Sequence, residues 1–420
     1  NKKVEHICKK SDRIKFLHKF VRGADMLYNY YNEKLLGIQD VNIKKVEEKE
    51  NKLEITLEKP RKASVCPACG CLGDRIHDYR MQKVADLSAF GKKVVLLYRK
   101  RRYVCSCGKR FFEENNIVGR YCRRTQRVIE AIINSLASVH SYSSVAKNYG
   151  VSVNTVIRYF NCVKYPKPAE LPEALGIDEF KGNSGGEKYN CILTDLTTKK
   201  VIDIIHDRKE ATLCEYFKHY DRSKVKYFVS DMYKPYAEIA RTYFKKATYI
   251  IDKYHWIRQV TWAFEAVRKE EQKKFSKTHR IYFKHSRFLL LKREKDLKPE
   301  EKQQVLNMLY TSADLSTAYF FKEELYKVME YGTREEQRYA LKKWIFGALD
   351  CGVEPMKKCA ETYQRWMTPI LNSLEYDYTN GFTEGCNNKI KVLKRNAYGL
   401  QDFDRFRNRI LYTYSSAPRA

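Results

Sequence analysis

The chain has 420 residues, 43% of them hydrophobic, with 18 Gly and 10 Pro, and carries a formal net charge of +30. Its length predicts two to four domains, its composition excludes a low-complexity protein, and the lack of an apolar run of roughly 20 residues excludes a membrane span. The charge favours a polyanion partner, because each Lys or Arg placed on a phosphate releases condensed counterions, although a basic soluble protein such as a ribosomal accessory factor would share it.

The first 34 residues are basic and predict an arm or a helix. Residues 35–120 predict a β-hairpin followed by a cysteine-rich zinc-ribbon domain. In VNIKKVEEKENKLEITLEKP, apolar and polar residues alternate on both sides of a turn-like EEKEN, which is typical of two paired strands. A second pair of strands is expected around residues 92–98 and 102–104.

Two close cysteine pairs lie in this segment, each followed by glycine: Cys66 with Cys69, and Cys105 with Cys107. Four thiolates in a tetrahedron are the ligands of structural zinc, and they leave no coordination position open for chemistry. We therefore expect a structural Zn²⁺ ion. Incidental reduced cysteines are the alternative, and Cys71 or His77 could replace one ligand. The 13 cysteines are otherwise scattered, as in a protein of the reducing cytoplasm.

Residues 121–164 predict a helix-turn-helix domain. In SYSSVAKNYGVSVNTVIRYF, one helix ends near Tyr149, Gly150 provides the turn, and Ser152 can cap a second helix. An ordinary pair of packed helices is the alternative, but the basic setting favours DNA binding. The residues expected to face DNA on the second helix are Asn154, Thr155, Arg158 and Tyr159.

The prolines of YPKPAELPEA mark a linker, after which strand-like and helical patterns alternate. The strand-like runs are LGIDEF, YNCILTDL, KVIDIIHD, VKYFVSD and ATYIID. This order predicts an α/β domain with a mixed sheet. The pattern is then almost wholly helical over residues 257–375, and a last helix follows the turn at Asn380-Gly381.

Two aspartates follow apolar, strand-like runs. Asp178 ends LGI and Asp231 ends YFVS, and acids at strand ends face the ligand-binding edge of an α/β sheet. Glu384 begins the last helix. Two aspartates from neighbouring strands and a glutamate from a helix could hold two Mg²⁺ or Mn²⁺ ions about 4 Å apart, which would activate water or a 3′-hydroxyl for in-line attack on phosphorus.

Each of these acids is weak evidence by itself, because a strand-end aspartate is more often a helix cap or a solvated loop residue. Four other acids compete for the same role: Asp195, Asp203, Glu179 and Asp252. Helical spacing places Asn388, Lys391 and Arg395 on the face of Glu384, where together with Lys394 they would meet DNA phosphates.

His255 follows the strand-like run YIID and could orient a scissile phosphate or a metal-bound water. A packed or capping histidine is the alternative. The four tryptophans, Trp256, Trp262, Trp344 and Trp366, could stack on a flipped base, but aromatic residues at helical spacing are more often part of a core.

The most specific pattern in the chain is the order of several segments. They are LLGIQDVNIKKVEE, VCPACG with RRYVCSCGKRFFEE, GIDEFKG, VSDMYKPY, IDKYHWIRQV and NGFTEGCNNKIKVLKRNAYGLQDFDRFRNRIL. From Leu35 onward the chain resembles the ISL3 family of bacterial insertion-sequence transposases. The resemblance implies an RNase H-like catalytic domain with a DDE triad, which falls here on Asp178, Asp231 and Glu384. It also implies an all-helical insertion before the glutamate.

The expected fold class is therefore a multidomain α+β protein with a zinc ribbon, a helix-turn-helix and an RNase H-like α/β domain interrupted by an all-helical insertion. The catalytic domain would comprise residues 165–256 and 376–420, with the insertion at residues 257–375.

The expected function is that of a DNA transposase that binds the terminal inverted repeats of an insertion sequence, cuts there with divalent metal ions, and joins the ends to target DNA. Because two ends must be brought together, we expect at least a homodimer on double-stranded DNA, at the nucleoid of the bacterial cytoplasm. Two other classes stay open: a non-catalytic DNA-binding regulator derived from a transposase, and an RNase H-like structure-specific nuclease.

Overall fold

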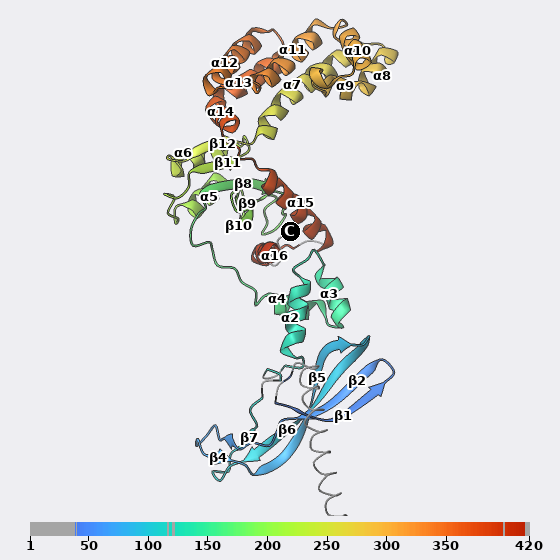
Figure 1. Cartoon of the computed structure of the whole chain (residues 1–420), viewed down its shortest axis with the longest axis vertical. Helices are drawn as coiled ribbons and strands as arrows, with labels where there is room; N and C mark the ends of the chain where they lie inside the picture. The colour runs from blue at the N-terminus through green and yellow to red at the C-terminus, as the bar shows by residue number, and fades with distance from the viewer. Residues whose placement is uncertain (1–37, 39, 116, 120–121, 398–399, 416–420) are drawn as a thin grey trace, which may run out of the picture. The chain divides into compact units, whose positions relative to one another are not determined.

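The computed structural model describes residues 38, 40–115, 117–119, 122–397 and 400–415 (Figure 1). The arm or helix expected at residues 1–34 lies outside them. The chain divides into two compact units. One comprises the described residues up to Ser135 together with Val145–Phe160, and the other comprises Leu136–Ser144 together with the chain from Asn161 onward.

The first unit contains a five-stranded sheet in the order β1-β2-β6-β5, with β7 paired to β6. Its strands are β1 (Asn42–Lys49), β2 (Lys52–Glu58), β5 (Ile76–Ala89), β6 (Lys92–Val104) and β7 (Arg110–Phe112). The antiparallel pair β1 and β2 is the hairpin predicted around EEKEN. Apolar side chains of β2, β5 and β6, among them Leu57, Val84 and Leu96, form the core on this sheet.

The two strands expected at residues 92–98 and 102–104 are one strand, β6, which pairs with β5 along its length. The basic run between them stays extended because the buried Arg101 guanidinium lies 3.1 Å from the carboxylate of Glu113. A buried charge is tolerated when it is paired in this way. The prediction of two separate strands was therefore wrong.

Two short strands, β3 (Ser64–Val65) and β4 (Leu72–Gly73), form a separate antiparallel ribbon around the first cysteine pair. Three helices follow the sheets along the chain: α2 (Gln126–Ser135), α3 (Tyr142–Tyr149) and α4 (Val153–Phe160). In the first unit α2 packs against α4.

The second unit contains a mixed five-stranded sheet in the order β10-β9-β8-β11-β12. Its strands are β8 (Ala174–Phe180), β9 (Asn190–Asp195), β10 (Lys200–Ile205), β11 (Tyr227–Ser230) and β12 (Thr248–Ile251). The pairs β8–β9 and β9–β10 are antiparallel, whereas β11 runs parallel to both β8 and β12. This is the mixed sheet that the sequence predicts.

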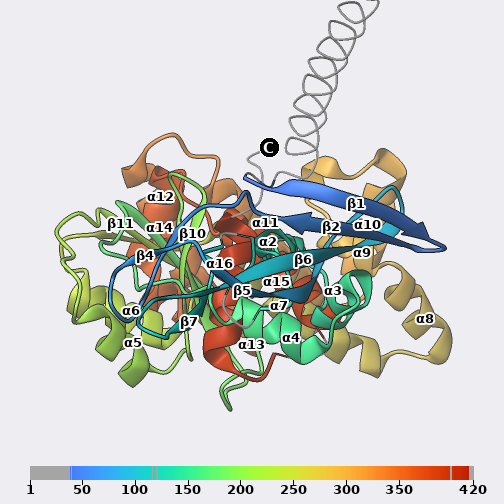
Figure 2. The same cartoon turned by 90° about the horizontal axis from the view of Figure 1, so that it is seen from below.

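Four helices accompany this sheet, and two of them, α5 and α6, lie next to each other (Figure 2). They are α5 (Glu210–Phe217), α6 (Lys234–Tyr243), α15 (Gly381–Asn396) and α16 (Phe403–Ser415). Residues of α5 and α6 share an apolar core with the strands, and α15 lies along β8 and β9 although it is distant in sequence. The last helix, α16, lies along β10.

Between β12 and α15 the chain is wholly helical, as the sequence predicts. The helices are α7 (Lys253–Lys274), α8 (Lys277–His285), α9 (Arg287–Leu291), the short η1 (Glu294–Asp296), α10 (Pro299–Leu309), α11 (Ala313–Val328), α12 (Arg334–Asp350), α13 (Glu354–Arg365) and α14 (Met367–Glu375). Trp256 and Trp344 are buried in their common core, whereas Trp262 is 51% exposed. Among the described helices, none has the length and apolar character needed to span a bilayer.

Candidate functional site

Three carboxylates meet at one edge of the mixed sheet. Asp178 lies on β8, Asp231 directly follows β11, and the two strands are parallel, so both residues reach the same edge. One oxygen each of Asp178, Glu179 and Asp231 lies within 4.8 Å of the others. Asp178 is not the last residue of its strand, because β8 continues beside β9 to Phe180 after its pairing with β11 has ended at Gly176.

Glu384 lies in the first turn of α15, as predicted, and is exposed. It is outside the group of three carboxylates, but its negative charge contributes to the raised pKa of Asp178. One turn further on, the buried Asn387 donates a hydrogen bond from Nδ2 to Asp178 Oδ2 at 2.8 Å. The helix that carries Glu384 is thereby fixed to the strand that carries Asp178.

The carboxylates stand in an unfavourable electrostatic environment. Burial, followed by repulsion from Glu179, raises the pKa of Asp178 to about 7 and that of Asp231 to about 8. Glu179 itself is held by neighbours, since Arg208 Nη1 donates to Oε1 at 2.8 Å and Tyr236 Oη donates to Oε2 at 3.2 Å. A bound cation would reverse the pKa shifts of both aspartates, because it stabilises the ionised form.

Three of the competing acids have structural partners elsewhere. Asp195 accepts hydrogen bonds from backbone N–H groups of the turn that follows it. Asp203 is buried and accepts hydrogen bonds from Arg407 and Tyr216. Asp252 caps α7. Only Glu179 among the competing acids lies in the carboxylate group, and its position next to Asp178 is the one sequence signal that favours it.

His255 lies in the first turn of α7 and is half-buried, with its ring edge-on to that of Tyr254 at a centroid distance of 5.6 Å. Its ring forms no hydrogen bond with a residue that the structure describes. The structure thus does not bring His255 into the carboxylate group, and its suggested supporting role stays a prediction.

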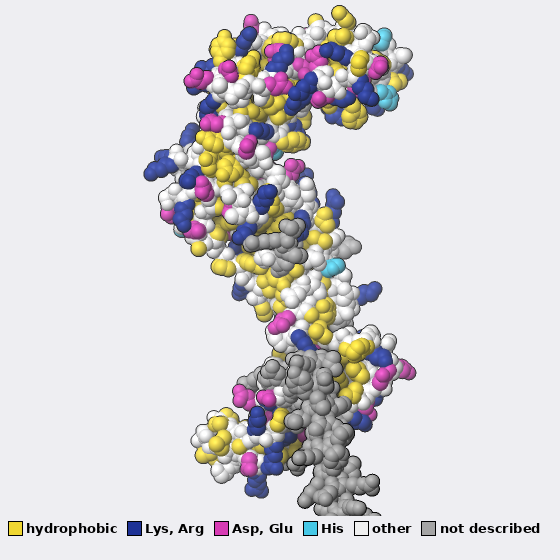
Figure 3. All heavy atoms as spheres, in the orientation of Figure 1, with side chains coloured by type: hydrophobic (Ala, Val, Ile, Leu, Met, Phe, Trp, Pro, Cys, Tyr) yellow, Lys and Arg dark blue, Asp and Glu magenta, His cyan; other side chains and the backbone are white. Residues whose placement is uncertain are grey.

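The outer face of α15 presents the predicted polar and basic residues. Asn388, Lys391 and Arg395 are exposed, and Lys391 Nζ donates to Asn388 Oδ1 at 3.1 Å. Lys394 differs from them because its Nζ donates to the backbone oxygen of Lys181 at 2.9 Å, and burial lowers its pKa. Lys and Arg side chains are spread over the visible face of each unit (Figure 3).

The four predicted cysteine ligands come together in the first unit. The Sγ atoms of Cys66 and Cys107 are 3.7 Å apart, and those of Cys69 and Cys105 are 3.4 Å apart. Thiolates at about 2.3 Å from a tetrahedral zinc ion would be separated by roughly 3.8 Å, so the four sulfurs fit this metal.

The turns of the two cysteine pairs use glycines in the left-handed conformation. Gly70 has a φ of +74° and Gly108 a φ of +82°, and each donates its N–H to the carbonyl of a cysteine in the same turn. Cys71 and His77, the predicted substitute ligands, lie outside the group of four sulfurs.

The helix-turn-helix has the predicted local geometry. Gly150 makes the turn with a φ of +60°, and Ser152 Oγ accepts a hydrogen bond from the N–H of Thr155 at 3.3 Å, which caps α4. Asn154 and Arg158 are exposed on α4, whereas Thr155 and Tyr159 are half-buried. Two of the four residues predicted to contact DNA are thus exposed on α4, and their contact with DNA stays a prediction.

Family comparisons agree with this arrangement. A family model described as "Transposase" matches residues 175–410, one described as "zinc-finger of transposase IS204/IS1001/IS1096/IS1165" matches residues 62–107, and one described as "Helix-turn-helix domain of transposase family ISL3" matches residues 113–161. Since the first model covers more than half of the chain, the chain belongs to the ISL3 family of transposases.

Individual relatives point the same way. The transposase for insertion sequence element IS1001 of Bordetella parapertussis is 27% identical over 91% of this chain and 97% of its own length. The transposase for insertion sequence element IS1557 of Mycobacterium tuberculosis is 30% identical over 28% of this chain and 26% of its own. A Lactococcus lactis protein named ATP-dependent protease matches at 33% identity, but over only 22% of this chain. The chain is a DNA-transposing enzyme whose zinc ribbon and helix-turn-helix serve DNA binding.

The zinc site can be tested by exchanging one sulfur. Cys69→Ser should remove zinc from the purified protein and lower the melting temperature, because a structural zinc site contributes directly to folding. Zinc content measured by elemental analysis checks this result. Cys71→Ser is the matched control, since Cys71 is exposed and outside the group of four. Full zinc content in the Cys69 variant would contradict the assignment.

The carboxylate group predicts a pH-dependent response to metal. In metal-free protein the folded-state pKa values of Asp178 and Asp231, about 7 and about 8, exceed the ordinary aspartate value of about 3.9. These groups therefore reduce the free energy of unfolding as pH rises from the ordinary value to the folded-state values. Added Mn²⁺ should therefore raise the melting temperature more at pH 8 than at pH 6. The difference should vanish in the double variant Asp178→Asn, Asp231→Asn. An equal rise at both pH values would count against a metal site here.

Proposed function

We propose that this transposase cuts and joins DNA at an active site formed by Asp178, Asp231 and Glu384, with two divalent ions, Mg²⁺ or Mn²⁺, as cofactors. The observation that carries this proposal is the meeting of Asp178 and Asp231 within 4.8 Å at one sheet edge, beside the helix that begins with Glu384. When bound, such ions would stabilise charge on the attacking and leaving oxygens during phosphodiester cleavage.

The fit of a divalent ion is supported by an uncompensated oxygen. Asn387 Oδ1 is buried and accepts no hydrogen bond from a residue that the structure describes, although its Nδ2 is bound to Asp178. Amide and carboxylate oxygens are the hard ligands that Mg²⁺ and Mn²⁺ prefer. We therefore add Asn387 to the residues that position or hold the ion.

Glu384 suits the role of the third metal-binding carboxylate better than Glu179 does. Both oxygens of Glu179 are already engaged, by Arg208 and Tyr236. The Glu384 carboxylate forms no ion pair or hydrogen bond with a residue that the structure describes, and it is exposed, so it can turn towards the aspartates. Glu179 would then act on the aspartates through its charge.

The order of the sheet supports an RNase H-like domain: three antiparallel strands in chain order, followed by two strands added in parallel on the other side of β8. We assign residues 165–256 and 376–420 to this domain and residues 257–375 to an all-helical insertion. Residues 35–120 would form the hairpin and zinc ribbon, and residues 121–164 the helix-turn-helix.

The DNA substrate would be the terminal inverted repeats of the element, bound in part by the exposed residues of α4, and target DNA. Asn388, Lys391, Lys394 and Arg395 would contact phosphates near the carboxylates. Pairing of two ends requires at least a homodimer on DNA. A regulator without catalysis and a structure-specific nuclease are the outcomes that the following experiments would reveal.

Removal of single carboxylates should separate binding from cleavage. Asp178→Asn, Asp231→Asn and Glu384→Gln should each reduce cleavage of an end-containing DNA by about a hundredfold or more, because the ions supply several kcal/mol of transition-state stabilisation. Binding of the same DNA, measured with Ca²⁺ in place of Mg²⁺, should persist. Asp195→Asn, in an exposed turn, is the control. Strand transfer at wild-type rate by any of the three variants would refute the assignment.

Asn387 should affect metal affinity as well as rate. Asn387→Ala should weaken Mn²⁺ binding, measured by calorimetry, whereas Asn387→Asp, which keeps an oxygen at this place, should retain it. Asn388→Ala is a neighbouring control on the exposed face of α15. Unchanged Mn²⁺ affinity in the Asn387→Ala protein would limit Asn387 to a packing role.

A further inference from the structure

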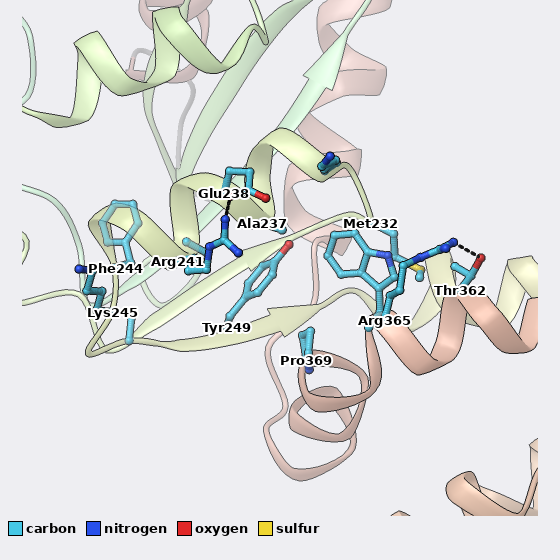
Figure 4. A pocket seen from close by; sticks show the side chains of 14 residues that line it. Met232, Ala237, Glu238, Arg241, Phe244, Lys245, Tyr249, Thr362, Arg365 and Pro369 are labelled. Carbon is cyan, nitrogen blue, oxygen red and sulfur yellow. Dashed lines mark hydrogen bonds and ion pairs between the residues drawn. The ribbon is translucent and has the colours of Figure 1, made fainter. Parts of the chain in front are cut away.

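A cavity lies in the second unit, between α6, β12 and the junction of α13 with α14 (Figure 4). Its volume is about 1190 Å³. An adjoining cavity of about 700 Å³ shares Arg241, Tyr249 and Pro369 with it, and we call the two cavities together the groove. The groove exceeds the roughly 300–1,000 Å³ typical of a site for one small ligand.

Two residues that line the cavity are linked to Asp231, one through the chain and one through hydrogen bonds. Met232, which lines it, directly follows Asp231 in sequence. Tyr249 in its wall shares a hydrogen bond of 3.0 Å with Ser230, and Ser230 Oγ donates to the carbonyl of Asp231 at 2.8 Å. The wall of the cavity is therefore joined to the end of β11, which Asp231 directly follows.

The wall of the cavity is aromatic and apolar. Trp366 is half-buried, and its ring meets that of Tyr249 edge-on at a centroid distance of 6.3 Å. Phe244, which also lines the cavity, is buried by stacking on Phe228. Aromatic faces of this kind bind nucleobases of any sequence by stacking, at about 1–3 kcal/mol per base.

The rim of the cavity is basic. Two of its cations have internal partners that Figure 4 shows: Arg241 pairs with Glu238, and Arg365 donates to Thr362 at 3.2 Å. Two lysines do not. Lys234 and Lys245 are exposed and form no ion pair or hydrogen bond with a residue that the structure describes. They are placed to receive phosphates.

We propose that this groove binds a single-stranded segment of DNA, with an unpaired base on Trp366 and backbone phosphates on Lys234 and Lys245. Duplex DNA does not suit it, because paired bases are stacked on each other and cannot reach an aromatic wall inside a cavity. Strand separation next to the cut would supply such a segment. This proposal rests on the proposed function for the position of the cut. It adds to that function a subsite for one DNA strand.

Stacking is tested with the full chain, a fluorescent oligothymidine of about 12 nucleotides and anisotropy measured with Ca²⁺ at fixed salt. Trp366→Ala should weaken single-strand binding by about tenfold and leave duplex binding unchanged, whereas Trp366→Phe should restore most of the loss. Trp262→Ala is the matched control, because Trp262 is an exposed tryptophan outside the cavity.

The phosphate contacts are tested through salt dependence. The double variant Lys234→Ala, Lys245→Ala should reduce the slope of log Kd against log salt by about 1.4 for single strands, since each lost phosphate contact releases about 0.7 fewer counterions. Lys246→Ala changes a neighbouring exposed lysine that does not line the cavity and should behave as wild type at this single-strand site. This pair of variants decides the question even if the Trp366 variant fails to fold.

Equal single-strand affinity in wild type and a folded Trp366→Ala protein would overturn the subsite, as would equal salt slopes for the double lysine variant and the Lys246 control. Failure of the proposed function has a different signature. It would appear as cleavage by the Asp178→Asn protein, whose single-strand affinity should be that of wild type.

Discussion

Repulsion between the carboxylates at one edge of the mixed sheet is the main electrostatic constraint on the fold of the second unit. Parallel pairing of β8 with β11 brings Asp178 and Asp231 to the same place, and Glu179 adds a third acid within 4.8 Å. Two unit charges at that distance repel by on the order of 3 kcal/mol at an effective dielectric constant near 20. Such a cluster weakens the fold unless protons or bound cations neutralise it, so a stabilising role does not account for it.

The surrounding contacts hold this unfavourable arrangement in place. Asn380 Nδ2 donates to the carbonyl of Ile177 at 3.1 Å, and the Asn380 N–H donates to the side chain of Asp252. Asn387 then binds Asp178 one turn after Glu384. Hydrogen bonds that are buried and satisfied fix geometry strongly, because breaking one leaves a polar group without water. The start of α15 is thus fixed to β8 at both ends of the turn that carries Glu384.

Local pattern was enough to predict much of this molecule. The strand-end position of Asp231, the helix start before Glu384, the four cysteines and the Gly150 turn all follow from short segments whose geometry depends on near neighbours. Features that depend on distant partners were missed. The extended path of β6 through its basic run needs Glu113, which the β6 sequence does not contain.

The site shows the same division between local and distant information. Asn387 looks like one of several polar residues on a helix, and only its contact with Asp178, 209 residues away, gives it a role. The sequence identifies Glu179 as an alternative metal-binding carboxylate, but it cannot rank Glu179 against Glu384. The partners of Glu179, Arg208 and Tyr236, come from other parts of the fold. The burial of Asp203 against Arg407 likewise depends on a contact between residues that are far apart in the sequence.

The helical segment is joined to strand β12 at both of its ends. It leaves the sheet directly after β12 and returns through α14, where Asn372 Nδ2 donates to the carbonyl of Tyr249 at 2.7 Å. Trp256, near the start of the segment, donates from its indole to Ser373, near the end, at 3.0 Å. More than a hundred residues therefore close on one edge strand, and Trp366 is positioned by that closure. Through Trp366 and Pro369 the helical segment thereby completes one wall of the groove.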